Sequence, residues 1–202
     1  MKIILKFFML LFCCISFGQS QKYIDEIKDF QKDLNEEISR DEKPILLPED
    51  KEDFKGLAFY PVDEKYRVTA KLVLIYDKTP IGFATTTDRI SYQTNYAEAH
   101  FKIDGKPYKL FLYESVAPIE EEGYENYLFL PFTDLTNGNG SYGGGRFIDL
   151  FIPEKGDEIV IDFNKAYNPY CAYSPNFSCP KPPAENHLEV AIEAGVKEFK
   201  EH

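Results

Sequence analysis

The segment Tyr92–Glu114 reads YQTNYAEAHFKIDGKPYKLFLYE, and it decides the fold class. Two runs of the kind that forms strands, Tyr92–Ile103 and Tyr108–Glu114, flank the turn Asp104-Gly105-Lys106. Asp and Gly tolerate the positive φ angles that a tight turn between strands needs, so the segment predicts a β-hairpin. A hairpin pairs its two strands antiparallel, whereas a parallel pair would need a long crossover between the runs.

Five further segments share this richness in aromatic and β-branched residues and are separated by turn residues. They are Tyr66–Tyr76, Ile81–Thr87, Tyr127–Phe132, Phe147–Ile152 and Glu158–Phe163. Short strands with hairpin-length connections and no intervening helices predict an α+β, mainly β protein: a single antiparallel β-sandwich or barrel-like domain.

Helices are predicted at both ends of these strands. Within Gln21–Arg40 the apolar residues lie three or four apart, which is typical of an amphipathic helix packed over a core. A second helix is predicted to begin near Ala184, with Leu188, Ile192 and Phe199 on one face. We therefore expect the β domain to be bracketed by N- and C-terminal helices.

The first eighteen residues predict a secretory signal peptide. Lys2 and Lys6 precede the apolar run Phe7–Phe17, which is too short to span a bilayer, and Ser16-Phe17-Gly18 offers a cleavage site. Residues 19–202 would then form a single globular domain, in keeping with an apolar content of 44% for the chain.

Export to the periplasm or the extracellular space follows from that signal. A lipoprotein anchored at Cys13 or Cys14 is disfavoured, because Phe12 and Cys13 stand where lipoprotein processing requires small residues. No later run approaches the ~18 apolar residues of a membrane span, so we expect no stable membrane insertion after cleavage.

The charge of the chain argues against nucleic acid as a partner. Loss of Lys2 and Lys6 would change the formal net charge from −11 to −13, because no acidic residue precedes Gln19. Phosphate contacts need clustered Lys and Arg, and carboxylates interrupt the basic groups here.

Cys171 and Cys179 are the two cysteines that remain after cleavage, and in an oxidising compartment they predict a disulfide. Redox chemistry is the less favoured alternative, because the spacing is not C-x-x-C. Zinc would need two further ligands, and His187 is the only histidine nearby.

The glycine-rich stretch before Arg146 suggests a ligand site. It satisfies G-x-G-x-x-G at Gly138–Gly143, but a strand pattern follows in place of the helix that dinucleotide binding requires. Arg is rare in this chain, and a guanidinium beside three glycines suits a carboxylate or phosphate ligand. The guanidinium could equally pair internally, with Asp134, Asp149 or Asp162.

A cleft between this stretch and the loop after Asn164 is therefore predicted. Its candidate ligand-binding residues are Tyr142, Arg146, Asp162, Asn164, Tyr167 and Asn168. Asp162 and Asn164 alternate along a strand end and face the same way, although both residue types also commonly satisfy loop backbone. No cofactor or metal is predicted.

An ordered string of motifs runs through the chain. The C-terminal part holds Phe132-x-Asp134-x-Thr136, Tyr142-Gly-Gly-Gly-Arg146-Phe-x-Asp149, Asp162-Phe-Asn164-x-Ala166-Tyr-Asn168-Pro, Cys171-Ala-Tyr, Cys179-Pro and Glu185-Asn186. The N-terminal part adds Gly56-Leu-x-Phe59-x-Pro61-x-Asp63 and Tyr66-Arg67-Val68. Together they resemble the domain-of-unknown-function 1684 family over roughly Lys22–Lys200.

That resemblance implies that the glycine–arginine turn and the Asn-Pro-x-Cys loop occur together, which favours a shared site, and it assigns no catalytic residue. We therefore expect an exported cell-envelope protein that binds a small polar or anionic ligand between these two elements. An exported hydrolase with Asp134, Asp149 or Asp162 as general base is the first alternative. A structural or assembly partner that uses aromatic residues of the Asn164–Pro183 loop is the second.

Overall fold

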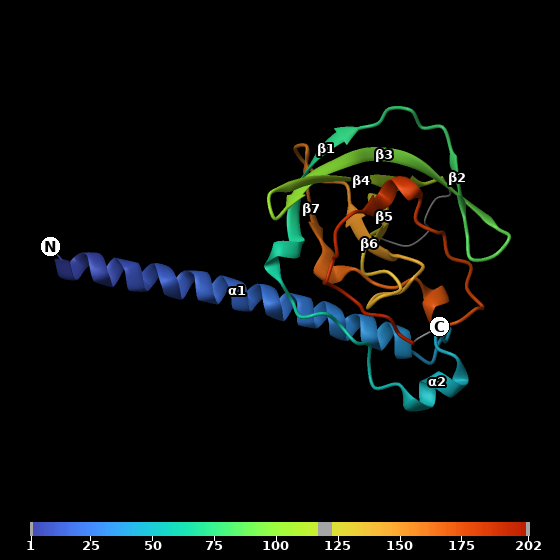
Figure 1. Cartoon of the computed structure of the whole chain (residues 1–202), viewed down its shortest axis with the longest axis horizontal. Coiled ribbons are helices and arrows are strands. Elements are labelled where there is room, and N and C mark those ends of the chain that lie inside the picture. The colour runs from blue at the N-terminus through green and yellow to red at the C-terminus, as the bar shows by residue number, and fades with distance from the viewer. Residues whose placement is uncertain (1, 117–122, 201–202) are drawn as a thin grey trace.

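The described strands form one sheet that curls into a half-barrel (Figure 1). The computed structural model describes residues 2–116 and 123–200, with side chains described from residue 21 onward. The strands are β1 (Arg67–Leu74), β2 (Ile81–Ala84), β3 (Ile90–Ile103), β4 (Lys106–Ser115), β5 (Tyr127–Asp134), β6 (Arg146–Phe151), β7 (Glu158–Asp162) and β8 (His187–Leu188). Their order is β6-β5-β4-β3-β1-β7, with β2 beside β3 and β8 beside β5. All pairs are antiparallel except β5–β8.

The hairpin predicted from Tyr92–Glu114 is confirmed as β3–β4. Asp104 and Gly105 have φ angles of 48° and 76°, which is the pair of positive angles that a two-residue hairpin turn requires. Ile103 then pairs with Lys106 across the turn. All seven predicted strands are present, with ends that shift by a few residues.

The concave face of the sheet carries the main core. Along β3, the residues Ala97, Ala99, Phe101 and Ile103 are buried at alternate positions, as expected for a strand with one face turned inward. The core also contains Leu110 and Leu112 of β4 and Leu128, Leu130 and Phe132 of β5, none of which is exposed to solvent. Each fully buried side chain of this size contributes about 1.5–3 kcal/mol to folding.

Helix α1 (Lys2–Ser39) includes the predicted amphipathic helix. Its C-terminal half packs against the β domain through Tyr23, Ile27, Leu34 and Ile38, all buried, while its N-terminal half extends away from the sheet (Figure 1). The predicted signal peptide falls on that N-terminal half, and its cleavage stays a prediction. Among the described helices, none is both long and apolar enough to cross a bilayer.

The predicted C-terminal helix is wrong. From Ala184 the chain forms a short 3-10 turn, η4 (Ala184–Asn186), then β8, and then an irregular segment. Leu188, Ile192 and Ala194 are buried and the residues between them are not, so this segment has the period of an extended chain. Gly195 has a φ of 76°, which is incompatible with an α-helix.

The sandwich alternative is not observed either, because the described strands belong to one sheet. Short helical elements complete the fold: α2 (Pro48–Asp53), η1 (Glu64–Tyr66), η2 (Phe163–Lys165) and η3 (Tyr170–Ala172). After β7 the chain pairs with the free edge of β6 at Tyr167, which exchanges backbone hydrogen bonds with Phe147. The Tyr167 side chain packs against the cluster of Phe129 and Phe147 on the outer face.

Candidate functional site

Arg146, the centre of the predicted ligand cleft, lies inside the protein. Its side chain is 0% exposed. Nη2 donates to Oδ2 of Asp134 at 2.8 Å and to the carbonyl of Ile192 at 2.9 Å, and Nη1 donates to the carbonyl of Ala194. The internal ion pair, which the sequence left open as an alternative, is therefore what forms. It fastens the C-terminal segment to β5 and β6.

Asp162 and Asn164 also bind groups of the protein itself. The hydroxyl of Tyr23, on α1, donates to both oxygens of Asp162 at 3.0 Å and accepts from Nδ2 of Asn164 at 2.8 Å. Oδ1 of Asn164 accepts from the backbone N–H of Asp63 at 3.0 Å. Burial and the nearby carboxylate of Asp162 raise the pKa of Tyr23 well above its usual value, so the hydroxyl stays a donor. These groups dock α1 onto the end of β7.

The six predicted ligand-binding residues do not line one common cavity. Asn168 is buried and donates to the carbonyl of Lys197 at 2.9 Å. The Tyr142 hydroxyl lies 3.8 Å from Sγ of Cys171. Of the six, only Tyr167 borders a hollow that lies between α1, β5 and β6.

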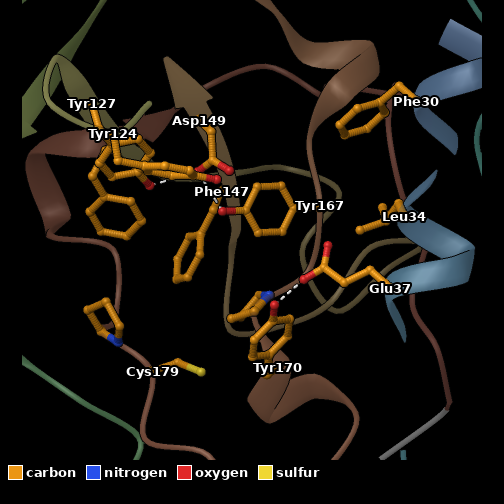
Figure 2. A pocket seen from close by; sticks show the side chains of 13 residues that line it. Phe30, Leu34, Glu37, Tyr124, Tyr127, Phe147, Asp149, Tyr167, Tyr170 and Cys179 are labelled. Atoms are coloured by element: carbon orange, nitrogen blue, oxygen red, sulfur yellow. Dashed lines mark hydrogen bonds between the residues drawn. The ribbon is translucent and has the colours of Figure 1, made fainter. Parts of the chain in front are cut away.

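That hollow, which we call the aromatic cavity, has a volume of about 410 Å³. It lies where α1 meets β5, β6 and the loop after β7 (Figure 2). Its thirteen lining residues are Phe30, Leu34, Glu37, Tyr124, Tyr127, Phe129, Phe147, Asp149, Tyr167, Pro169, Tyr170, Cys179 and Pro180. Two carboxylates are the only formal charges among them, and the lining includes no Lys or Arg.

Asp149 is the polar centre of the aromatic cavity. Its Oδ1 accepts hydrogen bonds from the hydroxyls of Tyr127 and Tyr167, both at 2.7 Å (Figure 2). The side chain is exposed to the cavity and yet surrounded by protein on its other sides. Burial raises the pKa of the Asp149 carboxyl, and this effect outweighs the two hydrogen bonds, which lower it.

The two tyrosines are held as hydrogen-bond donors by the same surroundings. Burial first, and then the negative charge of Asp149, raise the pKa values of Tyr127 and Tyr167 far above the usual value. Both hydroxyls therefore stay protonated at every physiological pH. Both hydroxyls donate to Oδ1 of Asp149, and no described residue donates a hydrogen bond to its Oδ2.

Glu37 brings a second carboxylate from α1. The hydroxyl of Tyr170 donates to its Oε1 (Figure 2). The negative charge of Glu37 contributes to the raised pKa of Asp149, so the two groups interact across the cavity. Both charged groups in the lining of the aromatic cavity are therefore acidic.

Aromatic rings form much of the wall. Phe147 packs edge-on against Phe129 with ring centroids 4.8 Å apart, and against Tyr167 with centroids 6.0 Å apart. Tyr124 and Tyr127 lie 5.3 Å apart, measured between ring centroids. Such rings present partly negative faces, which attract cations.

Strand alternation explains how the sequence produces this wall. Arg146, Ile148 and Leu150 face the core, whereas Phe147 and Asp149 face outward, toward α1. Asp149 was considered as a partner of Arg146 and as a general base, but it was missing from the predicted ligand-binding set. The alternation of side chains along β6 could have separated Asp149 from Arg146, because residues three apart on a strand face opposite sides of the sheet.

Cys171 and Cys179 are free thiols in this structure. The backbone N–H of Cys171 donates to Sγ of Cys179 at 3.3 Å, so the two residues are neighbours. The disulfide stays a prediction. Among the described residues, no three potential metal ligands come together.

The aromatic residues of the Asn164–Pro183 loop differ in burial. Tyr173 is 3% exposed, and Tyr167, Tyr170 and Phe177 are partly buried against the cluster that includes Leu34 and Ile38 of α1. The assembly hypothesis stays a prediction. This loop is part of the wall of the aromatic cavity.

The fold and cavity define the class: a mainly β protein with a curled antiparallel sheet, an N-terminal helix and an internal aromatic cavity. The chain belongs to the family described as "Protein of unknown function (DUF1684)", whose model matches residues 52–197. A comparison with curated proteins found no match.

Among solved structures, the chain is similar to an uncharacterised protein of Haloarcula marismortui, determined in solution by NMR. The two are 34% identical, with a TM-score of 0.69, and the similarity covers 92% of this chain and 99% of the other. The curled sheet is thus shared by an archaeal relative.

Proposed function

We propose that this protein binds a small ligand in the aromatic cavity, which accepts an ammonium or another hydrogen-bond donor at Asp149 and encloses an apolar body between aromatic walls. The observation that carries the proposal is the Asp149 carboxylate. Two tyrosine hydroxyls fix its Oδ1 at 2.7 Å, and the side chain borders a cavity of about 410 Å³. Small-molecule sites commonly have this size and combine an apolar lining with a few fixed polar groups.

The charged residues in the lining of the cavity indicate the charge of the ligand. Asp149 and Glu37 make the cavity negative, and the rings around them favour cations. Arg146, the residue that suggested an anionic ligand, is fully buried by its internal partners. These features support a cationic or neutral polar ligand over an anion. With the predicted export signal, they describe a binding protein of the cell envelope or the extracellular space.

Calorimetric titration with three probes of similar size tests the charge preference: benzylammonium, benzyl alcohol and benzoate. We expect affinity to fall in that order. In Asp149→Asn the affinity for benzylammonium should drop about tenfold or more, because a hydrogen bond to a charged group contributes about 1.5–3 kcal/mol. The advantage of benzylammonium over benzyl alcohol should disappear in the same variant.

Asp157→Asn is the matched control, since Asp157 is an exposed aspartate whose nearest cation is Lys71 at 3.6 Å. It should bind the probes as the wild type does. Tightest binding of benzoate, or unchanged benzylammonium binding in Asp149→Asn, would contradict the proposal.

Acid–base catalysis by Asp149 is a second candidate, favoured by its raised pKa beside a cavity. Of the three aspartates considered as general bases, Asp134 is bound to Arg146 and both oxygens of Asp162 accept from Tyr23. The two hydrogen bonds to Asp149 reach only its Oδ1, and this residue borders the cavity. Panels of ester, glycoside and amide substrates test it. Turnover that falls at least about 100-fold in Asp149→Asn would favour catalysis. Probe binding without turnover on any panel would favour a binding protein.

A further inference from the structure

Cys171 and Cys179 stand between two hollows of the molecule. Cys179 borders the aromatic cavity. Cys171 borders a second hollow of about 400 Å³, whose lining includes Tyr173, Phe199 and Lys200. Cys179 is buried, whereas Cys171 is half-buried and can be reached from this second hollow.

Two contacts surround Cys171. The hydroxyl oxygen of Tyr142 lies 3.8 Å from its sulfur, and its backbone N–H donates to Sγ of Cys179 at 3.3 Å. Interaction with the Cys179 side chain, the largest cause, and with the hydroxyls of Tyr142 and Thr86 lowers the pKa of Cys171 to about 6. The same contact, together with burial, raises the pKa of Cys179. At neutral pH the pair is therefore one thiolate and one thiol.

We propose that Cys171 and Cys179 form a thiol–disulfide exchange site, in which Cys171 attacks a low-molecular-weight disulfide that enters the second hollow and Cys179 completes the exchange. The division of roles follows from geometry. Cys171 is the accessible sulfur, and Cys179 is buried with its sulfur in contact with the Cys171 N–H at 3.3 Å. The site is separate from Asp149 and does not depend on the ligand proposed above.

The exchange takes place in two steps. The Cys171 thiolate attacks one sulfur of the small disulfide, forms a mixed disulfide with it, and releases the other half as a thiolate. That thiolate takes the proton of the Cys179 thiol, and the new Cys179 thiolate attacks Sγ of Cys171. The second half then leaves as a thiolate and takes a proton from water, so the protein loses two electrons and the small disulfide becomes two thiols.

Oxidation to a Cys171–Cys179 disulfide would link η3 to the chain that follows β2. The backbone N–H of Cys179 donates to Oγ1 of Thr86 at 3.1 Å, and its carbonyl accepts from the Thr86 N–H at 2.9 Å, so Cys179 is tied to the chain that follows β2. Cys171 lies on η3, next to Tyr170 of the aromatic cavity. The disulfide would therefore fix the position of η3 against that chain.

Oxidised glutathione and mass spectrometry test the proposal. The reduced wild type should form the Cys171–Cys179 disulfide without retaining glutathione. Cys179→Ser should stop at one glutathione on Cys171, and Cys171→Ser should react much more slowly. At pH 6 about half of Cys171 is thiolate, against about 0.3% of an ordinary thiol, but its intrinsic nucleophilicity is about tenfold lower. We therefore expect the first attack by Cys171 of the wild type, followed as loss of free thiol, to be about tenfold faster than that of free glutathione.

Tyr142→Phe removes one donor to the sulfur without altering either cysteine, and it should slow the reaction at pH 6 more than at pH 9. The proposal is overturned if Cys171→Ser and Cys179→Ser react equally fast, if the wild type retains glutathione, or if neither thiol reacts. Circular dichroism of each variant confirms that it is folded before the rates are compared.

Discussion

Replacing Arg146 by methionine removes a charge that the fold encloses completely. The guanidinium is 0% exposed and lies 2.8 Å from Oδ2 of Asp134. It also accounts for hydrogen bonds to the carbonyls of Ile192 and Ala194. Methionine fills a similar volume but donates nothing, so Asp134 would stay buried without its counter-ion.

The size of the effect follows from that lost partner. Removing one member of a buried ion pair costs about 3–5 kcal/mol, because the other charge stays desolvated and unpaired. Most domains have a free energy of unfolding of about 5–15 kcal/mol, so Arg146→Met should lose a large part of its stability. Arg146→Lys keeps the charge but loses the fixed fork of donors, and we expect a loss of about 2 kcal/mol.

Urea denaturation followed by circular dichroism measures both losses. Arg67→Met is the matched control, because this arginine also faces an aspartate, Asp162, but at 3.8 Å and with a side chain 50% exposed. It should lose no more than about 1 kcal/mol. A loss below about 0.5 kcal/mol in Arg146→Met would refute the reasoning. So would an Arg146→Lys variant that keeps full stability but no longer binds benzylammonium.

Three further changes probe other parts of the structure. Asn186→Ala should cost about 2–4 kcal/mol in urea denaturation, because the buried amide pairs with three backbone groups of β4 and β5; a loss below about 1 kcal/mol would contradict this. Gly195→Ala should cost about 2 kcal/mol or more, since φ is 76° and the added Cβ would lie 2.5 Å from the carbonyl oxygen of Ala166; an unchanged melting temperature would contradict it. The pKa of Asp149 is higher in the folded protein than in the unfolded chain, where it is ~3.9. The wild type therefore loses stability as the pH rises from the unfolded pKa through the folded pKa. Asp149→Asn should melt higher than the wild type at pH 7 but not at pH 3. An equal difference at both pH values, or the same gain in Asp157→Asn, would contradict that sign.

The β-hairpin and the strands could be predicted because their signals are local. Asp104 and Gly105 mark the turn, and the aromatic and β-branched runs mark the strands. The C-terminal segment was mispredicted because the four-residue spacing of Leu188 and Ile192 fits a helix as well as an extended chain. Tertiary contacts decide between them: the Ile192 N–H donates to Oδ1 of Asp134 at 3.1 Å, and the Val196 N–H donates to the carbonyl of Ala166 at 2.9 Å.

The candidate site was harder to predict because it depends on which surface α1 covers. Periodicity showed that Gln21–Arg40 would pack on the domain, but it could not show that Phe30 and Glu37 would face the outer side of β6. The scarcity of arginine did single out Arg146 correctly as an unusual residue. Its role is internal, and only the register of β5 against β6, with Phe132 opposite Arg146, places Asp134 on the same face.

The two faces of β6 therefore differ in how their charged residues are compensated. On the inner face, Arg146 and Asp134 neutralise each other and hold the C-terminal segment, so this buried pair is explained by the fold. On the outer face, Asp149 interacts with a second carboxylate, Glu37, and burial disfavours its charged form. The charged form of Asp149 lowers the stability of the folded protein, and yet two tyrosines hold this carboxylate at the edge of a cavity. Binding of a ligand or a reaction explains such a group better than stability does. That contrast within one strand of six residues is why we propose Asp149, and not Arg146, as the ligand-binding residue.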